Sequence, residues 1–261
     1  MMNRKEFART LLSGSALAGI LPLSLTGSAA IESERSEGFP FTPGAGRASG
    51  FDPLFNGQNM DGFVDMNTSP ETWWVEDGLL KCTGEPIGVI RTERQYENFL
   101  LDIEWRHMVP GGNSGVFILA DGVPFEDRPF PTGMEVQMLD TQWPVIHERP
   151  EEYAQGHLFP VMGLEGSIPD NPSEIASSRS ASLEDRVRRT GEWNRYLISC
   201  IDGVIKLSIN GRFVNGIHST IRKRGYICPE AEGSEIHFRR FDLLELPGGV
   251  LESHQSAEVV D

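Results

Sequence analysis

The segment from Gly133 to Asp140 carries three oxygen-bearing side chains that could take part in one chemical site. Glu135 and Gln137 alternate with apolar residues, so on a strand they share one face. Asp140 lies five residues after Glu135 and joins that face only if a β-bulge shifts the alternation, as bulges beside sites often do. Three converging oxygens suit proton transfer, a sugar hydroxyl or a hard cation. The alternative is that they form a polar outer face of a sheet.

A second predicted strand with a polar face runs from Phe99 to Met108. Glu104 and Arg106 share its polar face, and its other face carries the apolar residues Phe99, Leu101, Ile103 and Trp105. If the polar face lines a site, Glu104 could act as a base or a ligand and Arg106 could stabilise an oxyanion. If the face is solvated, the two side chains would form an ordinary surface ion pair.

Five further residues are candidates for binding. Trp193 and Asn194 open a predicted strand, where Trp193 could join the core or stack on a sugar ring and Asn194 could bind a hydroxyl group. Asn113 follows two glycines, so it either forms a turn or presents its amide to a substrate. His147 and His157 lie in or beside an irregular stretch, where a histidine is commonly only solvated but can also ligate a metal or carry a proton.

Strands joined by tight turns must position these residues. The chain contains 28 Gly and 17 Pro, which favours many turns over long helices. Asp-Gly or Asn-Gly pairs between alternating segments predict hairpins at 77–78, 202–203 and 210–211. About eleven short strands without a convincing helix indicate an all-β fold, a sandwich of two sheets.

Two features interrupt the strand pattern. Residues 141–190 are rich in proline and contain a serine run, so we expect an irregular connection that holds whatever helix the domain has. A connection of this length commonly carries function. Arg239-Arg240 breaks the alternation of the last predicted strand and predicts a bulge.

The amino terminus has the pattern of an export signal. Its basic start, mildly apolar stretch and small residues before position 30 are typical of a signal peptide, and residues 3–7 resemble a twin-arginine signal in which Lys replaces the second Arg. The apolar stretch is too short and too interrupted to span a membrane, so we expect a periplasmic or secreted protein. The predicted parts are a signal peptide at 1–30, a flexible linker at 31–50, the sandwich domain at 51–247 and a polar tail at 248–261.

Charge and cysteine content limit the partners and cofactors. A formal net charge of −15 repels phosphate backbones, which argues against a nucleic-acid partner. Cys82, Cys200 and Cys228 could form one disulfide, with Cys200–Cys228 the best pair because both lie in predicted strands, or could remain buried thiols. Their spacing does not suggest a zinc site.

Motifs along most of the domain resemble the 3-keto-disaccharide hydrolase domain family, whose fold is similar to concanavalin A-like lectins and glucanases. The matching stretches occur in family order over roughly residues 52–247: 54–57 (LFNG), 74–80 (WVEDGLL), 99–106 (FLLDIEWR), 113–117 (NSGVF), 133–140 (GMEVQMLD), 191–194 (GEWN), 209–211 (ING), 225–227 (GYI) and 236–239 (IHFR). The chain departs from the family where many members have Gly-Leu-Gln before His-Gly. Here Cys228-Pro229-Glu230 precedes Glu232-Gly233.

The resemblance implies a jelly-roll sandwich and a reaction on 3-keto-glycosides. A ketone at C3 acidifies the C2 proton, so that a base can remove it, the oxygen at C1 can leave and water can add. This chemistry needs a base, an acid or polarising group at the leaving oxygen and an electrophile for the enolate, for which a divalent cation, calcium or a transition metal, could serve. No organic cofactor is expected.

The residue types, together with the resemblance, divide the candidate residues into roles. The resemblance suggests that the strands of Glu104 and Glu135 lie in one sheet and line a common pocket. The catalytic candidates are Glu135, Glu104, Arg106 and Asp140; the substrate-binding candidates are Gln137, Asn194, Trp193 and Asn113; the metal candidates are Glu135, His157 and His147.

Two other functions fit the same fold. The pattern Glu135-x-Gln137-x-x-Asp140 is similar to the Glu-x-Asp-x-x-Glu strand of laminarinase-like retaining endoglucanases, which need two carboxylates about 5 Å apart. A non-catalytic carbohydrate-binding module is the third possibility, since fold alone does not decide function. Convergence of Glu104, Glu135 and Asp140 in one cleft would favour the enzymes.

Overall fold

A computed structural model describes residues 43–44, 46–149, 155–161, 179–218, 220, 222 and 224–246. The predicted signal peptide, the first part of the predicted linker and the polar tail lie outside these residues. In the described part of the chain, no helix is long and apolar enough to cross a membrane.

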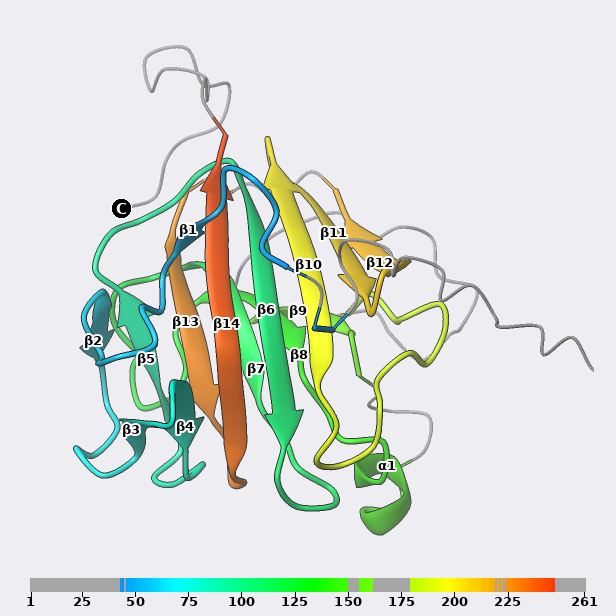
Figure 1. Cartoon of the computed structure of the whole chain (residues 1–261). Coiled ribbons are helices and arrows are strands. Elements are labelled where there is room, and N and C mark those ends of the chain that lie inside the picture. Colours follow the sequence, from blue (N-terminus) through cyan, green and yellow to red (C-terminus); the bar gives the residue numbers. More distant parts are fainter. Residues whose placement is uncertain are drawn as a thin grey trace, which may run out of the picture. The chain divides into compact units, whose positions relative to one another are not determined.

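Two antiparallel sheets form the domain, as the strand and turn pattern predicts (Figure 1). The eight-stranded sheet has the order β12 (Arg212–Ile217), β11 (Val204–Ile209), β10 (Asn194–Ile201), β6 (Phe99–His107), β14 (Ile236–Glu245), β4 (Leu79–Cys82) and β3 (Trp73–Glu76), and β1 (Asp52–Pro53) pairs with β14. The six-stranded sheet has the order β2 (Phe63–Asp65), β5 (Gly88–Thr92), β13 (Tyr226–Ala231), β7 (Gly115–Ala120), β8 (Gly133–Gln137) and β9 (Leu158–Val161).

The core lies between the two sheets. Alternating apolar residues of β6 meet those of β7 and β8 in one buried cluster that includes Leu101, Ile103, Trp105, Val116, Ile118 and Val136. The intervening residues of β7 and β8 point to the opposite face of the six-stranded sheet, because side chains alternate along a strand. On that face Phe117 is the cross-strand partner of Glu135 and packs in a separate small cluster.

Tight turns set the register of the hairpins. Asp77 (φ 54°), Asp202 (φ 50°) and Asn210 (φ 51°) are each followed by a glycine with positive φ, as the predicted two-residue turns require. The predicted bulge at Arg239–Arg240 is also present, as a register shift between Phe238 and Arg240 where β14 pairs with β6. These local predictions are confirmed.

The connection between β8 and β10 contains more regular structure than the sequence suggests. Its described part includes the short helix α1 (Trp143–Ile146), the one helix among the described residues, and the edge strand β9. Leu158 of β9 also forms a bridge with Ser180. The connection therefore adds a strand to the six-stranded sheet and is not irregular throughout.

A buried network of ion pairs covers the face of the eight-stranded sheet that points away from the core. Arg195, which is fully buried, pairs with Asp102 on the neighbouring strand β6. Glu104 pairs with Arg239 and lies 3.4 Å from Arg240. Because every one of these acids has an arginine partner, the polar face of β6 is satisfied within the sheet.

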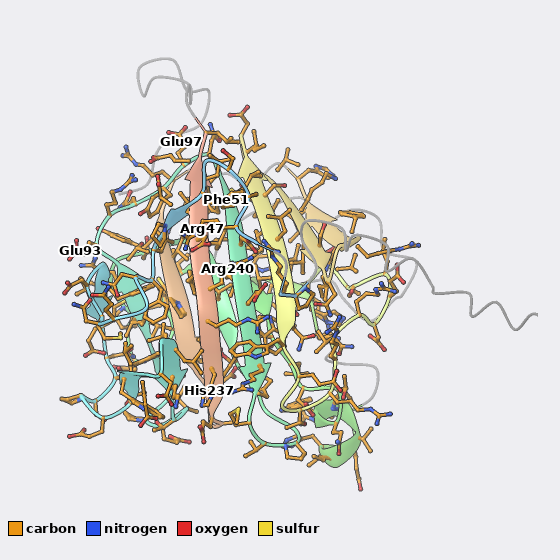
Figure 2. All side chains as sticks on the ribbon, in the orientation of Figure 1. Arg47, Phe51, Glu93, Glu97, His237 and Arg240 are labelled. Carbon is orange, nitrogen blue, oxygen red and sulfur yellow. The ribbon has the colours of Figure 1, made fainter. Side chains whose placement is uncertain are left out.

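Residues 43–44 and 46–50, which we name the N-terminal strap, lie against this network. The guanidinium of Arg47 donates to both carboxylate oxygens of Asp242, at 2.6 and 3.0 Å, and the amide of Gly44 donates to Glu104 at 3.0 Å. Figure 2 shows Arg47 near Arg240 on this face of the sheet. The end of the predicted flexible linker is therefore tied to the domain.

The three cysteines are buried free thiols, which confirms the second of the two alternatives, and the Cys200–Cys228 disulfide does not form. Cys200 and Cys228 belong to different sheets. Burial raises the pKa of Cys82 to about 12 and raises that of Cys228 as well. The thiols thus behave as small apolar side chains.

Candidate active site

A pocket of about 310 Å³ opens on the face of the six-stranded sheet that points away from the core. Side chains from β8, β9, the helix α1, the turn before β7 and the residue after β13 line it. Among them are Asn113, Glu135, Gln137, Trp143, Phe159 and Glu232. Polar and aromatic groups in one hollow of this size are typical of a small-molecule site.

Strand β8 places Glu135 and Gln137 side by side in this pocket. Both alternate with Val136, which is buried in the core, so their predicted orientation is confirmed. The side-chain amide Nε2 of Gln137 donates to Glu135 Oε1 at 2.9 Å. This bond holds the Glu135 carboxylate in place within the pocket.

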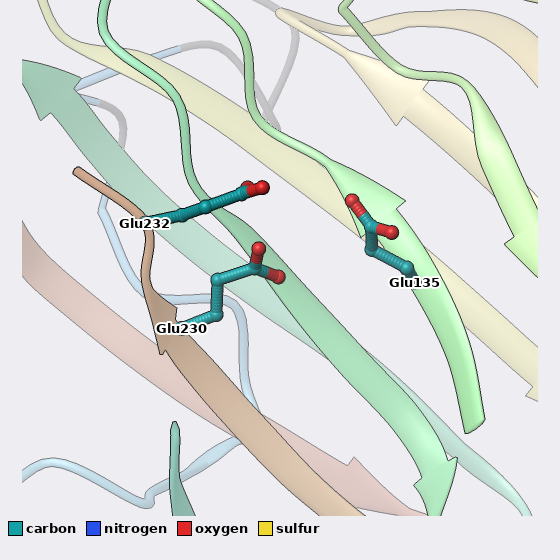
Figure 3. A group of neighbouring side chains, drawn as sticks. All are labelled: Glu135, Glu230 and Glu232. Carbon is teal, nitrogen blue, oxygen red and sulfur yellow. The ribbon is translucent and has the colours of Figure 1, made fainter. Parts of the chain in front are cut away.

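Two further glutamates converge on Glu135 from β13 and the residue after it. One carboxylate oxygen from each of Glu135, Glu230 and Glu232 lies within 4.8 Å of the others. Figure 3 shows the three side chains pointing toward one another, with Glu230 and Glu232 on one side and Glu135 on the other. We name these three residues the glutamate cluster.

Gly115 of β7 provides the space in which the cluster forms. Strand β7 lies between β13 and β8, and Gly115 pairs with Gln137. A Cβ atom at Gly115 would lie 2.7 Å from Glu230 Oε2 and 3.3 Å from Glu135 Cγ. Only glycine therefore leaves both carboxylates room at this point.

The cluster concentrates negative charge in a poorly hydrated place. Burial and, second, the charge of Glu232 raise the pKa of Glu135 to about 8. Burial also raises the pKa values of Glu230 and Glu232, and for Glu230 the charges of Glu232 and Glu135 add to the effect. Three carboxylates this close must share protons or neutralise a cation.

The donor atoms of the cluster fit a hard cation. All are oxygens, and Oε2 of Glu230, Oε2 of Glu232 and Oε1 of Gln137 are buried without a hydrogen-bond partner among the described residues. Carboxylate and amide oxygens are the ligands that calcium, magnesium and manganese prefer.

The two histidines predicted as metal ligands lie outside the cluster. His147 is exposed, and its ring stacks on Trp143 with 4.4 Å between the ring centres. His157 is buried, and burial together with the charge of Arg179 lowers its pKa to about 4. The metal candidates His147 and His157 are therefore not brought together with Glu135 in a ligand set.

Asp140 does not join the pocket, so the predicted bulge is wrong. Strand β8 ends at Gln137, and the Asp140 carboxylate accepts hydrogen bonds from the amides of Gly111 and Gln142, both at 2.9 Å, and from the Thr190 hydroxyl at 2.8 Å. Three donors occupy this carboxylate, which joins the segments around α1. Asp140 thus has a structural role.

Glu104 and Arg106 lie on the other sheet, and the prediction of a common sheet and pocket is wrong. Strand β6 belongs to the eight-stranded sheet and β8 to the six-stranded one, and the polar faces of both point away from the core between them. Glu104 is held in the ion-pair network, and the guanidinium of Arg106 lies 4.5 Å from the ring centre of Trp193. The proposed convergence of Glu104, Glu135 and Asp140 does not occur.

Of the predicted substrate-binding residues, Asn113 and Gln137 reach the pocket and the other two do not. Trp193 lies outside the pocket, and the guanidinium groups of Arg106 and Arg239 on the eight-stranded sheet lie 4.5 and 4.4 Å from its ring centre. Asn194 accepts from the Arg188 amide at 2.7 Å and from the Asn210 side chain at 3.1 Å, so it holds neighbouring turns.

Sequence reasoning missed Glu230 and Glu232 as site residues. The signal was present, because two carboxylates two residues apart at the end of an apolar strand share a face. Glu230 also occupies the position of the Gln, and Glu232 that of the His, in the motif Gly-Leu-Gln before His-Gly that many family members have. Which strand lies next to β8 in space, however, cannot be read from alternation.

The comparisons with known proteins agree with the motifs. The family model of the 3-keto-alpha-glucoside-1,2-lyase-like domain matches residues 50–244, which is nearly all of the two-sheet domain. The chain belongs to this family. The 3-keto-alpha-glucoside-1,2-lyase-like domain begins in the N-terminal strap and ends in β14, so it includes all three glutamates of the cluster.

Relatives share the domain at low sequence identity. A 3-keto-disaccharide hydrolase from Bacteroides thetaiotaomicron is 24% identical over 226 residues, covering 80% of this chain and 72% of the relative. A solved structure from Parabacteroides distasonis, assigned as a glycosyl hydrolase, is 22% identical with a TM-score of 0.57, covering 76% of this chain and 94% of that one. The carbohydrate-binding module CBM66 from Bacillus subtilis is 10% identical with a TM-score of 0.51, covering 70% of this chain and 96% of the module. The structural matches show the jelly-roll, concanavalin A-like fold, which serves both catalysis and binding.

Proposed function

We propose that the domain cleaves the glycosidic bond of a 3-keto-glycoside in the pocket that contains the glutamate cluster. One observation carries the proposal. Three carboxylates with raised pKa values converge in a pocket that also holds amide and aromatic side chains. Titratable groups perturbed in this way are typical of sites of proton transfer. The named relative and the family description supply the 3-keto substrate class.

The reaction proposed for this pocket is an elimination followed by addition of water. The base removes the C2 proton, the electrons form an enolate with the C3 ketone, and the glycosidic oxygen then leaves from C1 with a proton. Water adds across the resulting double bond, so the net reaction is hydrolysis. Glu135 is the candidate base, because it faces the pocket and the Gln137 amide orients it.

Other lining groups suit a sugar. Trp143 and Phe159 offer aromatic faces against which the C–H groups of a pyranose ring can pack. The amide oxygen of Asn113 is buried without a partner among the described residues, so it can accept from a sugar hydroxyl. The volume of about 310 Å³ is at the lower end for ligand pockets, which favours one or two sugar units.

A retaining endoglucanase is the second candidate, and one distance favours it. One carboxylate oxygen each of Glu135, Glu230 and Glu232 lies within 4.8 Å of the others, so a pair of them is near enough to serve as nucleophile and acid, which stand roughly 5 Å apart in retaining enzymes. The two mechanisms differ at C2, because elimination exchanges the C2 proton with solvent and direct displacement keeps it.

The experiment is cleavage of a 3-keto-glucoside in deuterated water, followed by mass spectrometry of the released sugar. We expect one deuterium at C2, and a rate that falls by roughly a hundredfold or more in Glu135→Gln, the scale of a lost general base. The control is Glu71→Gln, since Glu71 is exposed and outside the pocket. Product without deuterium would favour displacement, and full activity of folded Glu135→Gln would place the base elsewhere.

We also propose that the protein is exported. The support is the signal pattern in residues 1–30. Intact-mass measurement of the protein from an envelope fraction should give an amino terminus near Ala30 or Ile31. Protein that keeps Met1 and stays in the cytoplasm would contradict export.

A further inference from the structure

We propose that the glutamate cluster binds one hard divalent cation, with the amide oxygen of Gln137 as a further ligand. Calcium, magnesium and manganese are the ions of this class. The inference shares its location with the proposed function, but it concerns binding of an ion and is tested without a sugar.

The spacing of the oxygens fits a single ion. Ligand oxygens lie about 2.0–2.6 Å from such cations, so two ligands of one ion are at most roughly 4–5 Å apart. One oxygen each of Glu135, Glu230 and Glu232 meets this limit, with all three within 4.8 Å. One ion can therefore contact all three side chains.

Several side-chain oxygens in the pocket accept no hydrogen bond from the described residues and could therefore bind a cation. Gln137 is 4% exposed, and its Nε2 donates to Glu135, which leaves Oε1 buried in the pocket without a partner among the described residues. Oε2 of Glu230 and Oε2 of Glu232 are also buried without a hydrogen-bond partner among the described residues. A buried acceptor without a donor is destabilising, and a cation bound in this pocket would give these oxygens a partner.

The charge balance of the two sheet faces points the same way. On the eight-stranded sheet, the buried acids Asp102 and Asp242 have arginine partners. Arg149 lines the same pocket, but no salt bridge joins Glu230 or Glu232 to an arginine or lysine within the described part of the chain, although Oε2 of each is buried. Buried carboxylates are commonly paired or bound to a metal.

The ligand type selects the ion. The cluster offers carboxylate and amide oxygens and no cysteine or histidine, a set that favours hard cations over zinc or copper. Gly115 leaves space beside Glu230 for the ligands to adjust. A carboxylate has two oxygens, so Glu135 can offer one to the ion and keep the other for proton transfer.

The test is calorimetric titration of the chelator-treated full chain with calcium and, separately, with manganese. We expect one ion per chain for at least one of them. At an ion concentration one hundred times Kd, the melting temperature should rise by roughly 5–10 °C. Glu232→Gln should weaken binding about tenfold or more, because ligand charge sets affinity.

Controls separate the site from nonspecific binding to an acidic protein. Glu71→Gln removes an exposed charge outside the pocket and should bind the ion like the unchanged chain. If Glu232→Gln does not fold, Glu135→Gln is the second variant and should show the same loss.

Two results would overturn the cation site. One is the absence of saturable binding up to about 10 mM of either ion, tenfold above the weakest calcium modules. The other is binding that both cluster variants retain. A chain that binds the ion but does not cleave 3-keto-glycosides would refute the proposed function and leave the cation site standing. A chain that cleaves 3-keto-glycosides but binds no ion would refute the cation site and leave the proposed function standing.

Discussion

Substitution of Gly115 by alanine tests whether the geometry of the glutamate cluster, and not only its presence, determines activity. The backbone of Gly115 lies in β7 and has no positive φ, so alanine meets no backbone strain there. Its methyl group would be placed 2.7 Å from Glu230 Oε2, whereas ordinary contacts begin at 3.4 Å. The Glu230 carboxylate must therefore move by about 0.7 Å or rotate away.

The expected effects on stability and activity differ in size. Glycine in a strand is less favourable than alanine by about 0.5–1 kcal/mol, which offsets part of the cost of moving one side-chain end. We expect the free energy of unfolding to change by no more than about 1 kcal/mol, or roughly 2–4 °C in melting temperature. A misplacement of about 1 Å in an active site can reduce the rate by about a hundredfold, so we expect a clear loss of rate from the shift of Glu230.

The assay is kcat/KM on a 3-keto-glucoside together with thermal unfolding of the same preparation. Gly46→Ala is the matched control, because a Cβ atom at Gly46 would meet nothing within 4 Å. Folded Gly115→Ala with unchanged kcat/KM would show that the position of Glu230 does not matter for the reaction. Loss of activity in parallel with unfolding would likewise refute the argument that the pocket alone is affected.

Two further predictions concern residues outside the pocket. Glu104→Gln should lower the free energy of unfolding by about 3–5 kcal/mol, because it breaks a buried ion pair. The folded fraction should keep its kcat. A loss of kcat at unchanged stability would place Glu104 in the catalytic site. Cys82, Cys200 and Cys228 should react with a thiol reagent only after unfolding, and a reductant should leave the melting temperature unchanged; a shift on reduction would indicate a disulfide.

The sequence predicts what is local in this fold. Alternation identifies the strands and the inward side of β6 and β8, and Asp-Gly and Asn-Gly pairs identify the hairpins at 77–78, 202–203 and 210–211. The orientation of Glu135 and Gln137 follows from the same period of two, so alternation alone places both side chains on the face that carries the pocket.

How the site residues come together depends on which strands are neighbours, and the alternation of side chains does not specify the neighbours of a strand. A strand with a polar face has the same sequence pattern whether that face lines a pocket or holds ion pairs. The pattern therefore groups Glu104 with Glu135, although their strands lie in different sheets. Glu230 follows Glu135 by ninety-five residues, and only the order β13–β7–β8 brings them together. Asp140 was misplaced because its carboxylate is held by backbone amides of a turn that the sequence pattern does not specify.

The position of β14 limits when the domain can form. It is the last strand of the described chain, yet it lies between β6 and β4 in the middle of the eight-stranded sheet and also pairs with β1. Until residues 236–245 arrive, β3 and β4 have no sheet to join, and the strap residue Arg47 has no Asp242 to bind. A ribosome must therefore release almost the whole chain before the sandwich can close. A chain truncated before residue 236 would leave β12–β11–β10–β6 and β4–β3 as two separate groups of strands.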